Sequence, residues 1–289
     1  KLGPMQLVPG VTTINGWAFL LTMFFVGVLA PFINFAQPYI LTEHLRIPIS
    51  EQGAVSGDLA FWSEVVMILL AGVMGAWSDT MGRRLVFVFG LAGVALSYVL
   101  YPLATSYEEL LSYRLIYAVG MAAIGAMTIA IMAEYPVNQS RGKLSASVGV
   151  LSTLGVMFVV AVLAPLPARF VVGGATAIEA GRYTYWLTAG IALAGVLIAW
   201  LGLSKLKTAR NTALSLMQRL RIGLTAGRNP RIALSYGAAF IGRTDLVVVV
   251  IFLSLWITHV ALEQGMSTEE ALIEAGIMLG LMQGAGILF

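Results

Sequence analysis

Long apolar segments separated by short polar loops make up most of this chain. Eight of them are long enough to cross the hydrocarbon core of a bilayer as a helix, which takes about 20 apolar residues. They cover residues 16–41, 54–77, 85–106, 110–135, 144–167, 184–204, 232–260 and 271 to the end. Because these runs lack strict alternation and exceed the length of a barrel strand, they favour helices. The pattern predicts an all-α, polytopic membrane protein.

Composition narrows the class of protein further. Of the 289 residues, 59% are apolar and 11% charged, whereas a soluble domain is about 25% charged. A chain this apolar needs lipid against much of its surface, which excludes an ordinary soluble enzyme, a disordered protein and a nucleic-acid binder. It has no cysteine, and its only histidines are His44 and His259. We therefore expect no enzymatic centre, no metal site and no cofactor.

Lysine and arginine gather in alternate loops, and this predicts the orientation in the membrane. The loops after the second, fourth and sixth apolar segments hold Arg83, Arg84, Arg141, Lys143, Lys205, Lys207, Arg210, Arg219, Arg221, Arg228 and Arg231. The opposite loops carry few cations and most of the glutamates. By the positive-inside rule we expect the N-terminus in the cytoplasm, in a bacterial-type inner (plasma) membrane.

The basic stretch 205–231 is the one clear linker. We expect it to contain an amphipathic helix on the cytoplasmic surface, between a six-helix bundle at 1–204 and helices seven and eight at 232–289. A weak internal repeat agrees with two copies of one unit, because YILTEH at 39–44 can be set against LWITH at 255–259. On this interpretation the second bundle stops after two helices and the chain is a fragment.

The loop after the second segment carries the most specific motif, GAWSDTMGRR at residues 75–84. It resembles the G-x-x-x-D-x-x-G-R-R loop signature of the major facilitator superfamily, and it lies in the expected loop. The resemblance implies two six-helix bundles that alternate access to the two sides of the membrane. It also implies a conformational latch between the bundles, formed by Gly75, Asp79, Gly82, Arg83 and Arg84. Thr80 departs from the family, where a basic residue is common.

The chemistry of this loop can be interpreted residue by residue. Gly75 is expected to let neighbouring helices approach closely, and Gly82 to allow a tight turn. The alternative to a latch is a positively charged turn whose only role is to orient the chain in the membrane. Glu134 and Arg141, around the exit of the fourth segment, are also common in the family, and we add them to the latch.

Two looser matches concern the fourth and first segments. Arg114, with Ala118 and Gly120, resembles the R-x-x-x-G-x-G pattern of the family's fourth helix, except that alanine replaces the first glycine. The stretch NFAQPYI at 34–40 resembles the n-x-A-x-P-x-I pattern of the family's proton-driven exporters. Those exporters have an aspartate where this chain has Leu29, and their fifth helix has a Gly-Pro pair that is missing here. Both differences argue against a drug/proton antiporter.

Charged residues inside apolar segments are candidates for function, because a charge near the bilayer centre is costly. Arg243 and Asp245 lie roughly 16–20 Å into the seventh segment, near the midplane. At a spacing of i, i+2 they point to different sides of a helix and each needs its own partner. Our hypothesis is that they bind substrate or couple an ion. The alternative is a fixed structural salt bridge to another helix.

Four further residues complete the candidate site. Glu64 is either a proton-titrating carboxyl or a counter-ion for Arg243 or Arg114. Arg114 is a substrate or coupling residue, with snorkelling to the interface as the alternative. Asn34 and Gln37 either hydrogen-bond a substrate or join helices.

These features favour a secondary active transporter that moves a small organic solute by alternating access. We expect proton coupling, with Asp245 or Glu64 as the titrating group, and a monomer in the lipid bilayer. The internal cation Arg243 favours an anionic or zwitterionic solute. The alternatives are a non-transporting scaffold or assembly factor of the same fold, and a drug exporter.

Overall fold

The computed structural model describes residues 2–205 and 216–288. Within the helices, its description leaves out the side chains of residues 216, 219, 220, 224, 239–250 and 283–288. The described chain is helical, with two isolated bridges near the N-terminus, and this confirms the all-α prediction.

Each of the eight predicted segments is helical, and some helices carry a short turn at one end. The first four are α1 (Thr13–Phe35) continued by α2 (Gln37–Tyr39) and η1 (Ile40–His44), α3 (Ile49–Met81), α4 (Arg83–Leu100) continued by η2 (Tyr101–Leu103), and α5 (Tyr107–Glu134). The fifth comprises η3 (Asn138–Ser140), α6 (Arg141–Phe158), η4 (Val159–Leu163) and α7 (Leu166–Val172). The last elements are α8 (Ala177–Gly202), α9 (Leu216–Ala226) in the linker, α10 (Pro230–Glu263) and α11 (Thr268–Leu288). Among the described residues, six helical segments between Thr13 and Gly202 are long and apolar enough to cross a membrane.

Several helices begin a few residues before their apolar run, because polar residues cap their first turn. The side chains of Thr12, Ser106 and Thr176 each accept a hydrogen bond from the backbone N–H three residues on. Such caps satisfy backbone donors that the first turn leaves unpaired. The helix starts therefore lie outside the window that hydropathy alone defines.

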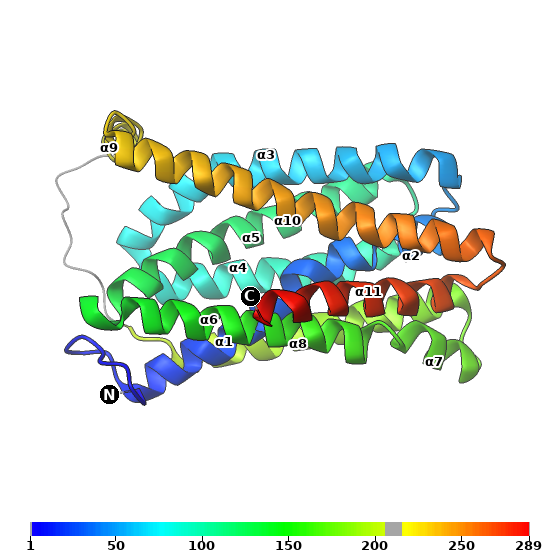
Figure 1. The fold of residues 1–289 in the computed structure, drawn as a ribbon, viewed down its shortest axis with the longest axis horizontal. Coiled ribbons are helices and arrows are strands. Elements are labelled where there is room, and N and C mark those ends of the chain that lie inside the picture. The colour runs from blue at the N-terminus through cyan, green and yellow to red at the C-terminus, as the bar shows by residue number, and fades with distance from the viewer. Residues whose placement is uncertain (1, 206–215, 289) are drawn as a thin grey trace.

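The first six spans form one bundle, in which α1 packs against α6 and α8, α4 against α5 and α8, and α3 against α5 (Figure 1). Glycine residues allow pairs of these helices to approach closely where they cross. A Cβ built on Gly155 of α6 would lie 2.4 Å from the Phe24 carbonyl oxygen of α1, and one on Gly120 of α5 would lie 2.6 Å from the Gly90 carbonyl oxygen of α4. The backbones of these helix pairs therefore touch, as in other helix contacts that small residues allow.

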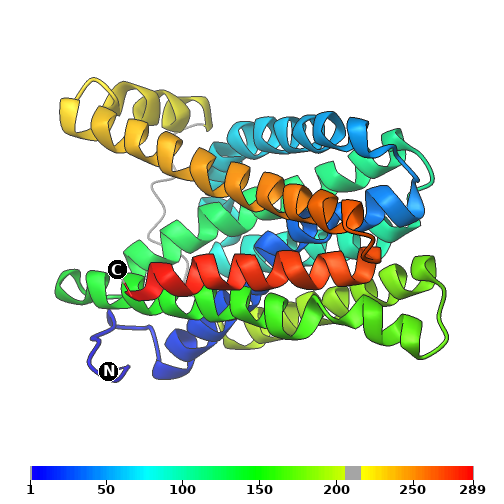
Figure 2. The ribbon, with the colours of Figure 1, turned by 45° about the vertical axis from the view of Figure 1, so that its right-hand side comes forward.

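Helices α10 and α11 lie along this bundle and pack against each other (Figure 2). α10 contacts α1 and α3, and α11 contacts α6 and η4. On α11, a Cβ at Gly276 would lie 3.1 Å from the Ala164 Cβ, and one at Gly280 would lie 3.2 Å from a Val160 methyl. This glycine face brings α11 close to the first bundle.

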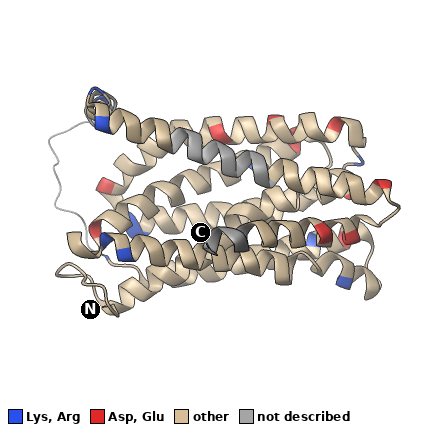
Figure 3. Ribbon diagram, viewed as in Figure 1, with Lys and Arg blue, Asp and Glu red and all other residues tan. Residues whose placement is uncertain are grey.

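The basic segments collect at one end of the molecule. The α3–α4 loop, the start of α6, α9 and the start of α10 all lie at the left end in Figure 1, and blue ribbon is concentrated there in Figure 3. The opposite end holds the start of α3, the α7–α8 turn and the α10–α11 corner. The cation-rich loops thus share one side, as the charge pattern requires. That this side faces the cytoplasm stays a prediction.

Candidate functional site

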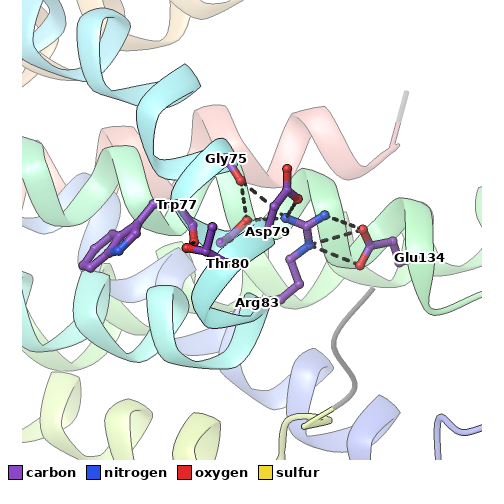
Figure 4. Close-up of polar contacts among 7 residues, drawn as sticks. Gly75, Trp77, Asp79, Thr80, Arg83 and Glu134 are labelled. Carbon is purple, nitrogen blue, oxygen red and sulfur yellow. Dashed lines mark hydrogen bonds and ion pairs between the residues drawn. The ribbon is translucent and has the colours of Figure 1, made fainter. Parts of the chain in front are cut away.

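Arg83 joins three helix ends at the basic end of the bundle (Figure 4). Gly82 separates α3 from α4 with φ of 96°, a conformation that glycine adopts without steric cost. This turn puts Arg83 at the start of α4. Its Nη1 pairs with Asp79 of α3 at 2.8 Å, and its Nη2 pairs with Glu134 of α5 at 2.7 Å. Arg83 Nε also donates to both Glu134 oxygens at 3.2 Å.

Gly75 takes part in this cluster through its backbone. Its carbonyl oxygen accepts hydrogen bonds from Arg83 Nη1 at 3.4 Å and from Ser78 Oγ at 2.6 Å. A Cβ at Gly75 would meet no described atom within 4 Å. No close helix approach at Gly75 is thus seen among the described residues, and the expectation that this glycine permits one stays a prediction.

The other two arginines of the predicted latch lie apart from this cluster. Arg84 Nη1 donates to the Trp200 carbonyl at 3.0 Å, and its guanidinium carbon lies 5.0 Å from the centre of the Trp200 ring. This cation–π contact ties α4 to the end of α8. Arg141 donates to the Ala133 carbonyl at 3.1 Å on the exposed surface. Thr80, where a basic residue was expected, donates to the Trp77 carbonyl at 2.8 Å.

The phenol of Tyr135, directly after α5, connects this end of the bundle to the residues that follow α8. Its oxygen accepts a hydrogen bond from the Ser204 backbone N–H at 2.9 Å. Burial raises the pKa of Tyr135 to about 12, so the phenol stays neutral at physiological pH.

Arg114 lies in the interior of the bundle, 2% exposed. Its Nε donates to Ser63 Oγ of α3 at 3.1 Å, and its Nη2 donates to Asn34 Oδ1 of α1. The guanidinium carbon lies 5.5 Å from the centre of the Tyr117 ring. Arg114 does not snorkel, because α5 begins at Tyr107, before the apolar run, and carries Arg114 about 10 Å past the helix start.

Three tyrosines lie near enough to this arginine to interact with it electrostatically. Tyr101 and Tyr185 stack with ring centres 5.6 Å apart, and Tyr98 lies 6.0 Å from Tyr185. All three rings are buried. Sequence reasoning missed these tyrosines, since each is a single polar group in an apolar run. Their nearness to Arg114 depends on how α4 with its continuation η2, α5 and α8 meet.

The remaining candidates fall into separate groups. Gln37 is buried, with Nε2 donating to Ser56 Oγ at 2.7 Å and Oε1 accepting from Tyr101 at 3.4 Å. These bonds join helices, as one of the two interpretations expected. Glu64 follows Ser63 on α3, is half-buried and has an interaction partner. Asn34 and Arg114 are thus in direct contact. Gln37 instead bonds to Tyr101, one of the tyrosines near Arg114.

Arg243 and Asp245 lie among the residues whose side chains are outside the described part of the structure. The backbone around them is helical, within α10. The hypothesis about their role therefore stays a prediction.

A second set of contacts joins α10 and α11 to the first bundle at the end opposite Arg83. We call it the distal seam and define it by the pairs Glu43–Thr268, Tyr39–Glu269 and Phe35–Ser254. Thr268 Oγ1 donates to Glu43 at 2.5 Å, Tyr39 donates to Glu269 at 3.2 Å, and Ser254 Oγ donates to the Phe35 carbonyl at 2.9 Å. The seam holds the two parts of the chain together at this end.

Comparison with known proteins gives a consistent result. A family model described as Major Facilitator Superfamily matches residues 12–289. The magnetosome protein MamH of Paramagnetospirillum magneticum is 28% identical over 85% of this chain and 56% of its own length. The magnetosome protein MamZ of Magnetospirillum gryphiswaldense is 24% identical over 92% of this chain and 42% of its own length. The chain thus spans about half the length of these curated relatives.

A solved structure shares the fold. The crystal structure of a D-xylose–proton symporter superposes with a TM-score of 0.63 at 16% identity, covering 94% of this chain and 67% of the symporter. The family model, the relatives and this shared fold all cover most of the chain, and the signature at 75–84 lies in the loop where its resemblance was noted. The chain belongs to the major facilitator superfamily of membrane transporters.

Proposed function

We propose that this chain is part of a secondary active transporter that moves a small organic solute by alternating access and is coupled to protons. The observation that carries the proposal is the buried guanidinium of Arg114, held by Ser63 and Asn34 from two other helices. A charge kept inside a membrane bundle is expensive and is characteristic of substrate and ion pathways. A bundle that served only as a scaffold would be more stable with an apolar residue there.

The two ends of the molecule support alternating access. The cluster around Arg83 stiffens the basic end within the first bundle. The distal seam connects the first bundle to α10 and α11 through hydrogen bonds. Hydrogen bonds between hydroxyls and carboxylates can break and re-form as two parts rock against each other. The proposed cycle opens the distal seam in one state and closes it in the other.

Proton coupling needs a carboxyl that titrates inside the membrane. We assign this role to Asp245 or Glu64, because each is a carboxylic acid inside one of the predicted apolar segments. Each has an isosteric amide, so Asp245→Asn and Glu64→Gln are the informative variants. Loss of pH-driven uptake in one of them, with counterflow retained, identifies the coupling residue.

The experiment uses the full-length protein in proteoliposomes. A thermal-shift screen over organic solutes first finds compounds that stabilise the purified protein. Those compounds are then tested for counterflow and for uptake after a pH jump. We expect saturable counterflow of at least one stabilising compound, accelerated by an inward proton gradient. If no stabilising compound exchanges across the membrane, transport is contradicted.

One observation supports the alternative function, a non-transporting scaffold or assembly factor. The relatives MamH and MamZ, which match most of this chain, are named as magnetosome proteins. We propose on this likeness that the protein acts in a magnetosome membrane, where either a transporter or an assembly factor would fit. A fluorescent fusion that stays in the plasma membrane, away from isolated magnetosomes, would contradict this location. Counterflow then separates the two functions.

A further inference from the structure

Arg114 forms no ion pair within the described part of the chain. Its hydrogen-bond acceptors, Ser63 Oγ and Asn34 Oδ1, are neutral, and its other neighbours include the phenols of Tyr117 and Tyr101, which are neutral as well. A guanidinium does not lose its proton in proteins. A buried charge without a counter-ion costs several kcal/mol, and neutral acceptors offset only part of that cost. The surroundings of Arg114 therefore favour an added negative charge.

Two buried donors near this position lack a hydrogen-bond partner among the described residues. One is Arg114 Nη1 and the other is the Tyr185 hydroxyl, on a side chain 1% exposed. Buried polar groups are nearly always paired, with protein, water or ligand. Two donors with no described partner, beside a cation with no described counter-ion, are the groups that an anion would satisfy.

The neighbouring hydroxyls are already engaged. Tyr98 donates to the Leu29 carbonyl and Tyr117 to the Ala30 carbonyl, the latter at 2.7 Å. Tyr101 donates to Gln37. Of the tyrosines around the guanidinium, Tyr185 thus has the hydroxyl that is available, and it is held in place by stacking on Tyr101.

We propose that Arg114 Nη1 and the Tyr185 hydroxyl bind a small anionic group, a carboxylate or a comparable oxyanion. This deepens and rests on the proposed function, since it makes the transported solute an acid or makes a co-transported anion part of the cycle. Both sources present the same chemistry, an oxygen bearing negative charge that accepts hydrogen bonds from a guanidinium and a phenol.

The test is equilibrium binding to purified full-length protein, which requires no transport. Sodium acetate and sodium nitrate are titrated at constant ionic strength, with chloride, which is not an oxyanion, as the balancing anion. The readout is the thermal unfolding midpoint and the intrinsic tryptophan fluorescence, because Trp186 adjoins Tyr185. We expect a saturable rise in the midpoint with acetate or nitrate in the wild type.

Matched variants locate the site. Arg114→Gln is expected to abolish the saturable response, and Tyr185→Phe to weaken binding about tenfold, the effect of losing one hydrogen bond to a charged group. The controls are Arg169→Gln and Tyr183→Phe, whose side chains are exposed, and both should bind as the wild type does. If Arg114→Gln does not fold, Arg114→Lys keeps the charge but not the planar fork, and we expect it to bind at least tenfold more weakly.

An unchanged response in Arg114→Gln would overturn the proposal, as would the absence of any saturable response in the wild type.

A final comparison identifies the source of the anionic group. Stabilisation by organic acids but not by their amides assigns the site to the solute, and stabilisation by nitrate alone assigns it to a co-transported ion. Anion binding without counterflow would support this site while contradicting the transport function, so the two proposals fail separately.

Discussion

Two arginines of this chain lie in opposite electrostatic surroundings. Arg83 keeps 14% of its side chain exposed and pairs with Asp79 and Glu134. Arg114 is 2% exposed, and both of its hydrogen-bond acceptors are neutral. Both guanidinium groups stay charged. The charge of Arg83 is neutralised by its two carboxylate partners, and the cluster joins the ends of α3, α4 and α5. Arg114 has no acidic partner among the described residues.

The Arg83 junction is tested by Glu134→Gln, which keeps the shape of the side chain and removes its charge. We expect a loss of about 1–2 kcal/mol, since a partly buried bidentate pair becomes a neutral hydrogen bond. Thermal unfolding should show a midpoint a few degrees lower, whereas the exposed control Glu51→Gln should change it little. An unaltered midpoint in Glu134→Gln would mean that the ion pair contributes nothing to the folded state.

Two glycines of the 75–84 motif differ in whether their positions can accept a side chain. Gly82 has φ of 96°, whereas Gly75 lies in a helix with open space at its Cβ. Gly82→Ala is expected to cost about 1–2 kcal/mol, because an L-residue is strained at positive φ. Gly75→Ala should be neutral or stabilising, because alanine is the better helix former. Equal unfolding midpoints for the two variants would contradict this distinction.

The same residues show what sequence reasoning could and could not predict. The turn at Gly82 was predictable, because the motif puts a glycine between two long helices. The openness around Gly75 was not, since it depends on which face of α3 meets a neighbour. The depth of Arg114 was underestimated because the polar first turn of α5, capped by Ser106, extends the helix beyond the apolar run. The tyrosines around it come from helices that only the fold brings together.

At the scale of elements, hydropathy was sufficient to identify the helices but not their contacts. Each predicted segment is helical, and the linker contains α9. Which helices touch is decided by small residues whose spacing carries little signal in one sequence. Gly27 of α1 and Gly155 of α6 meet backbone to backbone, whereas Gly149 of α6 has no described atom within 4 Å of a built Cβ.

This contrast provides a matched pair within one helix. Gly155→Ala should destabilise the protein by about 1–3 kcal/mol, because the added methyl group forces α1 and α6 apart. Gly149→Ala should leave stability unchanged or slightly raised. Thermal unfolding of the purified variants measures both. A Gly155→Ala protein as stable as the Gly149→Ala protein would show that the crossing is looser than the structure indicates.

At the scale of the whole molecule, polar contacts mark the two ends of the bundle. The Arg83 cluster lies at the basic end and the distal seam at the other, where α10 and α11 meet the first bundle (Figure 1). If the distal seam opens during transport, fixing it must stop the cycle. The 289 residues of this chain contain no cysteine, so an introduced pair supplies the only thiols within them.

A double variant, Glu43→Cys with Thr268→Cys, tests this prediction. The native side chains are in contact at 2.5 Å, so a short bifunctional methanethiosulfonate should cross-link the two cysteines through reducible disulfides. Cross-linking should reduce counterflow at least tenfold, and reduction should restore it. The single-cysteine variants control for loss of the native hydrogen bond. Full counterflow in the cross-linked protein would show that this end does not open.

The most direct test of the account is counterflow by the Arg114→Gln variant of the full-length protein in proteoliposomes. With the exposed variant Arg169→Gln as the matched control, and folding checked by thermal unfolding, we predict at least a tenfold loss of solute exchange in Arg114→Gln alone. A folded Arg114→Gln protein that exchanges solute at the wild-type rate would contradict the assignment of the buried guanidinium to the transport site.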